Sequence, residues 1–168
     1  MNTPKKQSEP SYLISPERIS RLKVQGYDTG FTDEEISEHA VGNRFAYQMC
    51  TVLFSTGLAL TSIPVLAVGA IIAFSTVLLP YHPFDYVYNY VIRHWLKRPK
   101  LPRRTNQAKF ACGIASLWLG IIIYLFYHSL FTWGYVLGGI LLVIALLVST
   151  IDFCIPSIIY NKLFRKRK

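Results

Sequence analysis

The stretch from Phe110 to Asn161, FACGIASLWLGIIIYLFYHSLFTWGYVLGGILLVIALLVSTIDFCIPSIIYN, decides the fold. It contains no lysine or arginine, and Asp152 is its only acid. A helix needs roughly 20 apolar residues to cross a bilayer, so this stretch is long enough for two crossings. The polar residues around Ser129 divide it into predicted spans at 110–127 and 133–153.

A second stretch, from Phe45 to Ile92, also lacks lysine and arginine, and it divides at Pro64 into predicted spans at 45–60 and 65–79. Hydrophobic residues make up 52% of the chain and charged residues 16%, against about 25% charged residues in soluble domains. This composition argues against a compact water-soluble enzyme. We therefore expect an all-α integral membrane protein that folds as a four-helix bundle.

The 18 basic residues fall into three blocks: the N-terminal segment, the loop between the second and third spans, and the C-terminal end. Lysine and arginine favour the cytoplasmic side of a membrane, so both termini are expected in the cytoplasm. The predicted organisation is a cytoplasmic segment (1–44), a four-span domain (45–163) and a basic tail (164–168). A protein with fewer spans and one buried core helix is the alternative.

Two helix starts are predicted ahead of the first span. Ser15 followed by Pro16 is typical of an N-cap and a first helical turn. Thr32 and Glu35 have the spacing of a capping box. The second signal predicts a helix that begins at Asp33 and continues into the first span.

The loop between the second and third spans contains an amphipathic segment, 84–96. Its aromatic and aliphatic residues share one helical face, whereas Asn89, Arg93 and Lys97 lie on another. Aromatic rings prefer the headgroup region, and a basic face attracts anionic lipid. We expect an in-plane helix on the cytoplasmic side that anchors the chain to lipid and does not bind nucleic acid.

The predicted topology places the three cysteines near one end of the bundle. Cys50 lies shortly after the start of the first span, Cys112 begins the third, and Cys154 follows the fourth. Cytoplasmic thiols normally stay reduced, so the three are candidates for reactive or metal-binding thiols. For Cys50 and Cys112, packing as small apolar side chains is the simpler interpretation.

Cys154 has a more distinctive context. Asp152 stands at the end of a span, where a charge is costly unless it faces a polar or wet site. Pro156 ends or restarts the helix, and Ser157 occupies the second position of a Cys-x-x-Cys spacing. A helix that starts at Pro156 favours the Cys154 thiolate, whereas a fourth helix that simply ends there disfavours it. Asp152 is a candidate proton acceptor for the thiol.

The chain resembles a bacterial membrane family catalogued as domain of unknown function 4395. The resemblance covers Asn43–Leu163, including Lys109-Phe110-Ala111-Cys112 and Phe153-Cys154-Ile155-Pro156-Ser157-Ile158-Ile159-Tyr160. Family members typically carry Phe-Cys-x-x-Cys-x-x-Tyr here, so Ser157 replaces the usual second cysteine. Either the chain is a natural monothiol variant, or a cysteine was changed to hold a mixed disulfide. The resemblance implies a thioredoxin-like or sulfurtransferase-like partner.

These observations give three hypotheses. In the first, an inner-membrane protein performs thiol–disulfide exchange or sulfur transfer through Cys154, with Asp152 tuning its protonation. Cys112 or Cys50 would act as the resolving thiol in place of Ser157, and no cofactor or bound metal is expected. The second is a non-enzymatic scaffold or adaptor, and the third a transporter of soft metals or small thiols. Small residues spaced four apart in the spans leave a homo-oligomer open.

Overall fold

The computed structural model describes residues 14–164, and the basic tail beyond Phe164 lies outside these residues. The described part of the chain is mostly helical and contains no β-strand. Its helices are α1 (Pro16–Leu22), α2 (Asp33–Ala59), α3 (Ile63–Leu78), α4 (Pro83–Val87), α5 (Arg93–Leu96), α6 (Asn106–Tyr127), α7 (Phe131–Ile151) and α8 (Ile155–Phe164), with π-helical turns at Lys23–Tyr27 and Tyr88–Ile92.

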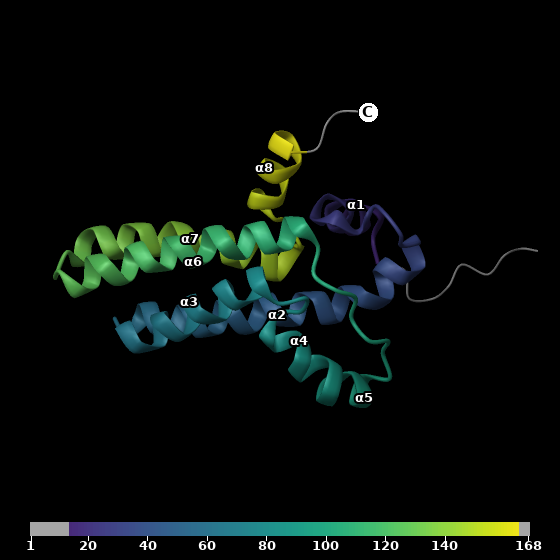
Figure 1. The fold of residues 1–168 in the computed structure, drawn as a ribbon, viewed down its shortest axis with the longest axis horizontal. Helices are drawn as coiled ribbons and strands as arrows, with labels where there is room; N and C mark the ends of the chain where they lie inside the picture. Colours follow the sequence, from purple (N-terminus) through teal and green to yellow (C-terminus); the bar gives the residue numbers. More distant parts are fainter. Residues whose placement is uncertain (1–13, 165–168) are drawn as a thin grey trace, which may run out of the picture.

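Four long helices, α2, α3, α6 and α7, lie side by side (Figure 1), and each overlaps one of the four predicted spans. Helix α2 packs against α3 and α7, and α6 packs against the same two neighbours. The short turns that join α2 to α3 and α6 to α7 lie at one end of the bundle (Figure 1). The shorter helices α1, α4, α5 and α8 lie toward the other end.

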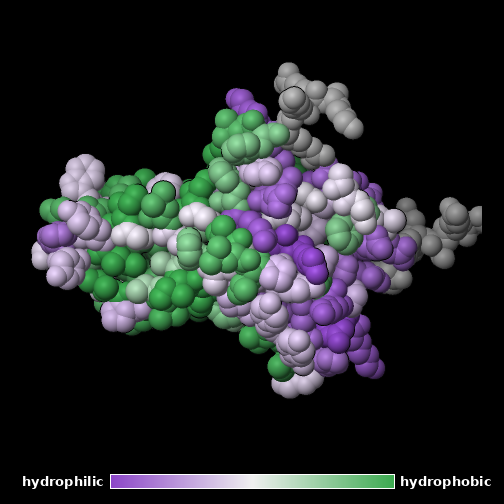
Figure 2. Space-filling model, in the orientation of Figure 1, coloured by the Kyte–Doolittle hydropathy of each residue, from purple (hydrophilic) through white to green (hydrophobic). Residues whose placement is uncertain are grey.

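The outer surface of the bundle is apolar. Figure 2 shows hydrophobic residues over the long helices and hydrophilic residues around α1 and α5. Helices α6 and α7 are each long and apolar enough to cross a membrane, and α3 meets this criterion together with Pro83–Leu96 across a bend of 81°. Large apolar side chains point outward, including Val68, Ile71, Leu117, Ile121, Val136 and Val143. Because soluble proteins rarely expose so large an apolar surface to water, this surface indicates a lipid environment.

The core at the turn end of the bundle consists of interlocking aliphatic and aromatic side chains. Small residues permit the close approach of the helices. A side chain at Gly138 would clash with Leu58, and one at Gly134 would clash with Phe126. A side chain at Gly120 would meet no neighbour within 4 Å, so only some of the small residues serve packing within this chain.

The segments before the bundle follow the predicted helix starts. Thr32 and Glu35 form the predicted capping box, and α2 runs without a break from Asp33 into the bundle. Helix α1 begins at Pro16 as predicted, but the side chain of Ser15 makes no capping hydrogen bond.

The amphipathic segment forms the helical stretch Pro83–Leu96, but its faces differ from those predicted. Tyr88 and Asn89 are both buried, although Asn89 was expected on an exposed polar face. The side-chain oxygen of Asn89 accepts a hydrogen bond from the Leu101 amide at 2.9 Å. The wider π-helical turn at Tyr88–Ile92 changes the register that an α-helix would give, which explains the difference. Trp95 remains exposed.

Candidate functional site

The turn between α7 and α8 places Cys154 at the start of a new helix. Asp152 ends α7 in the left-handed conformation, with φ of 58°. Helix α8 begins at Ile155, and the carbonyl oxygen of Cys154 accepts the amide of Ile158 at 3.4 Å. A new helix therefore begins beside Pro156. Its N-terminus, with the positive end of the helix dipole, favours a Cys154 thiolate.

The Cys154 sulfur has one close polar neighbour. The hydroxyl of Ser157 donates a hydrogen bond to it at 3.1 Å. Ser157 is fully buried, and Cys154 is 6% exposed. Burial raises the pKa of the Cys154 thiol, whereas hydrogen bonds from the Ser157 hydroxyl and backbone amide act in the opposite direction. The resting thiol is thus protonated and sheltered, and exchange requires access to be opened.

The three cysteines line one cavity of about 220 Å³ between the helices. Cys50 comes from α2, Cys112 from the first turns of α6, and Cys154 from the start of α8. The remaining lining is largely aliphatic, with Thr51, Tyr47 and His82 as polar exceptions. The three cysteines, which the sequence predicts near one end of the bundle, therefore line the same cavity.

Cys50 contacts a histidine. Its sulfur lies 3.3 Å from Nε2 of His82. The other ring nitrogen, Nδ1, accepts the amide of Phe84 at 3.1 Å, so a neutral His82 carries its proton on Nε2. His82 then donates a hydrogen bond to the Cys50 sulfur, and it does not act as a base toward that thiol.

The carboxylate of Asp152 contacts two arginines. Its carboxylate pairs with Arg18 of α1 and with Nη2 of Arg44 of α2, the latter at 2.5 Å. The Asp152 carbonyl oxygen also accepts the side-chain amide of Gln25 at 2.8 Å. These contacts fasten the N-terminal segment to the turn that carries Cys154. Asp152 was predicted as a proton acceptor for the Cys154 thiol. These contacts of Asp152 within the described residues do not include Cys154.

A second buried ion pair organises the neighbouring loop. Arg104 donates to both carboxylate oxygens of Asp85, at 2.5 and 2.7 Å, and to the side-chain oxygen of Asn43 at 2.5 Å. Its guanidinium also lies 5.2 Å from the ring centre of Tyr47. Asp85 in turn accepts the backbone amide of His82 at 2.9 Å. His82 and Asp85 thus cap α4, and Arg104 fixes that cap to the bundle.

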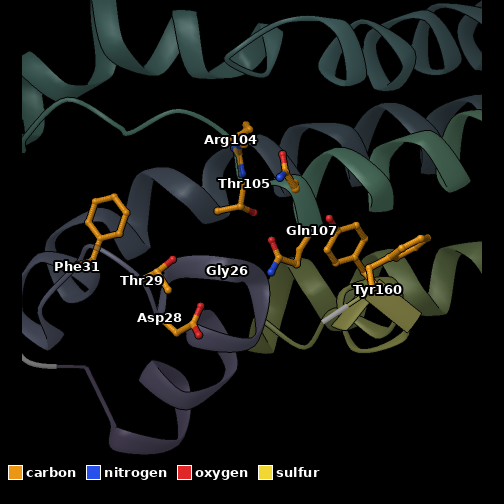
Figure 3. A pocket seen from close by; sticks show the side chains of 10 residues that line it. Gly26, Asp28, Thr29, Phe31, Arg104, Thr105, Gln107 and Tyr160 are labelled. Atoms are coloured by element: carbon orange, nitrogen blue, oxygen red, sulfur yellow. The ribbon is translucent and has the colours of Figure 1, made fainter. Parts of the chain in front are cut away.

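A polar cavity of about 530 Å³ lies on the other side of α8 (Figure 3). Thr105 and Gln107 reach it from the start of α6, Tyr160 from α8, and Thr29 from the N-terminal segment. Ile155, Pro156 and Ile159 of α8 line the cysteine cavity, whereas Tyr160 and Phe164 line the polar one. Helix α8 is therefore the wall between a polar space and the three thiols.

Three thiols in one cavity suit soft metals. Within residues 14–164, no group of three or more His, Cys, Asp or Glu side chains is arranged to hold a metal ion, and this includes the three cysteines.

A family model described as "Domain of unknown function (DUF4395)" matches residues 39–165. The chain belongs to this family. The part of the DUF4395 chain that matches contains all three cysteines, Asp152 and the Arg104–Asp85 pair, but not Arg18. Comparison with curated proteins and with solved structures finds no match.

Several residues of the DUF4395 site carried no signal in the sequence. Arg18 and Arg44 are far from Asp152 along the chain, and Arg104 is one of several basic residues in its loop. Trp118 lines the cysteine cavity although it looked like an ordinary apolar residue of a span. A buried arginine could have been suspected only from Asp85, which is the one acid in its apolar stretch.

Proposed function

We propose that the chain is a four-span protein of the bacterial inner membrane, with both termini in the cytoplasm, that performs thiol–disulfide exchange or sulfur transfer through Cys154. The observation that carries the proposal is the position of Cys154. It sits at the N-terminus of α8, accepts a hydrogen bond from Ser157, and shares a cavity with two further thiols.

The chemistry needs only one thiolate at a time. Either the Cys154 thiolate attacks a disulfide of a thioredoxin-like partner, or a partner thiolate attacks a disulfide that includes Cys154. In both directions one S–S bond breaks, one forms, and one thiolate leaves. With a sulfurtransferase-like partner that carries a persulfide, the Cys154 thiolate would instead attack the outer sulfur. The partner's S–S bond then breaks, its cysteine leaves as a thiolate, and Cys154 carries the persulfide. Cys112 or Cys50 supplies the second thiol that Ser157 lacks.

Access to Cys154 depends on α8. Asn161 accepts a hydrogen bond from Gln107 at 3.1 Å and donates one to the Val24 carbonyl at 2.7 Å. These two contacts hold the helix against α6 and the N-terminal segment. Displacement of α8 would open the cysteine cavity toward the polar cavity, where a partner could reach the thiol.

Asp152 has a positioning role in this proposal. With Arg18 and Arg44 on its carboxylate, it fixes the turn from which α8 departs. It thereby sets the position of Cys154 rather than accepting its proton.

Trapping of mixed disulfides tests the thiol chemistry. Cells that express the full chain are treated with an oxidant and analysed on non-reducing gels. We expect a larger band that disappears on reduction and in Cys154→Ala. Either Cys112→Ala or Cys50→Ala should strengthen the band, because the variant that removes the resolving thiol leaves the mixed disulfide unresolved. If no band forms and all three cysteines resist alkylation, the scaffold hypothesis takes its place.

Labelling of single cysteines tests the orientation. In a background without native cysteines, Thr132→Cys lies at the turn end of the bundle and Thr29→Cys at the opposite end. An impermeant maleimide applied to intact spheroplasts should label Thr132→Cys and spare Thr29→Cys until the membrane is opened. The reverse pattern would invert the proposed topology.

A further inference from the structure

One residue that lines the cysteine cavity carries a hydrogen-bond donor that the thiol chemistry does not use. Trp118 of α6 lines the cavity, and its indole Nε1 is buried without a hydrogen-bond partner among the described residues. A buried N–H without a partner is destabilising, so a ligand with an acceptor oxygen would be stabilised there. The nearby cavity residues Leu66, Leu119 and Leu141 are aliphatic and supply no acceptor from their side chains.

The size and polarity of the cavity restrict its occupant. Its volume is about 220 Å³, and in another protein an apolar cavity of about 150 Å³ binds benzene. One substituted ring therefore fits, whereas a peptide or a glutathione-sized polar molecule does not. The bundle around the cavity has an apolar exterior, so the ligand must also be soluble in lipid.

The donor and one of the three thiols lie on the same helix. Cys112 and Trp118 both line the cavity from α6 and are six residues apart, which corresponds to about 9 Å along the helix axis. One hydrogen bond of about 2.9 Å and one ring can occupy that length. A ligand whose oxygen meets Trp118 can therefore extend as far as Cys112.

We propose that this cavity binds the ring of a membrane quinone and that the quinone oxidises Cys112 and Cys154 to a disulfide. This proposal rests on the proposed function, because it supplies the oxidant for the same thiols. Each thiol gives up one electron and one proton, a Cys112–Cys154 bond forms, and the quinone takes up both electrons and both protons to become a quinol. Helices α6 and α8, which carry the two cysteines, are packed together, whereas Cys50 is engaged by His82.

Binding is tested with the full chain in vesicles that contain decylubiquinone as the probe. Trp95→Phe and Trp133→Phe, both at exposed positions, leave Trp118 as the reporter of fluorescence quenching. Gly69→Val places methyl groups in the cavity lining, where a Cβ has only ordinary contacts, and Gly120→Val is the matched control because its Cβ meets no neighbour within 4 Å.

We expect saturable quenching that Gly69→Val weakens at least about tenfold and Gly120→Val leaves unchanged. Trp118→Phe is assayed in the otherwise native chain by the loss of two alkylatable thiols when quinone is added. Oxidation of the thiols in this variant should need on the order of tenfold more quinone, because one hydrogen bond to the ligand is lost. Quenching that does not saturate, or that is equal in both glycine variants, would overturn the quinone site and leave a lipid chain as the occupant.

The two proposals fail in different ways. Quinone binding is measured in Cys154→Ala as well, where no thiol exchange at this position can occur. Binding without any mixed disulfide in the native chain would refute the proposed function. A mixed disulfide with Cys154 in a chain that shows no saturable quenching, or whose thiols decylubiquinone does not oxidise, would refute the quinone proposal alone.

Discussion

The hydroxyl of Ser157 donates a hydrogen bond to the sulfur of Cys154 from the position where a second cysteine would complete a Cys-x-x-Cys pair. A hydroxyl at this place can stabilise a thiolate but cannot form a disulfide with it. In the proposed exchange, Ser157 would stabilise the Cys154 thiolate once it forms, and the resolving step would fall to a thiol from another helix.

Removal of the Ser157 hydroxyl should make Cys154 less reactive. Since this hydrogen bond lowers the pKa of the Cys154 thiol, Ser157→Ala should raise that pKa and reduce the thiolate fraction roughly tenfold near neutral pH. The alkylation rate of Cys154 as a function of pH, measured with Cys50 and Cys112 replaced by alanine, reports the change. An unchanged rate profile would mean that Ser157 only fills space.

Loosening of α8 should have the opposite effect on reactivity. Asn161→Ala removes both side-chain contacts that hold α8, so the helix should open more often and alkylation of Cys154 should accelerate about fivefold. The control is Asn106→Ala, at an exposed position in the first turn of α6. Equal rates in the two variants would show that access to Cys154 does not depend on α8.

The sequence was sufficient to place the long helices, because lipid-facing helices require long apolar runs without basic residues. It also placed the cysteines toward one end, since helices that run up and down return to the same side. It could not pair Asp152 with Arg18 and Arg44, because an ion pair between distant segments leaves no local pattern. Nor could it foresee the burial of Asn89, which depends on a π-helical turn that a regular helical period does not describe.

The two ion pairs of the N-terminal region should differ strongly in their effect on stability. Asp152→Asn keeps a residue that tolerates the left-handed conformation but leaves Arg18 and Arg44 facing each other without a counter-charge. Because Asp152 is buried and the arginine side chains are only 22% exposed, we expect a loss of about 2 kcal/mol in the free energy of unfolding.

The matched control is Asp33→Asn, which removes an exposed pair with Lys23 and should cost less than about 1 kcal/mol. Thermal unfolding in detergent measures both changes. Limited digestion with trypsin should also cut the segment around α1 faster in Asp152→Asn. A larger effect for Asp33→Asn would contradict the assignment of Asp152 as the fastening point.

His82 should make the fold sensitive to acid. Burial and the nearby charge of Arg104 lower the pKa of His82 from 6.5 to about 4, against the opposing influence of Asp85. The groups around its ring are the Cys50 thiol, Arg104 and Asp85. Because the unfolded chain takes up this proton first, the contribution of neutral His82 is complete above pH 6.5. It is lost as the pH falls toward 4, by about 3 kcal/mol.

In His82→Asn, the side-chain oxygen can still accept the Phe84 amide and cap α4, but no proton is bound in this range. Denaturant unfolding at pH 7, 5.5 and 4 should therefore show a shallower loss of stability for His82→Asn than for the native chain. His94→Asn, an exposed histidine of α5, should retain the native slope. If stability falls equally with pH in all three proteins, His82 does not carry the acid sensitivity. A steeper fall in His82→Asn would mean that His82 protects the fold against acid.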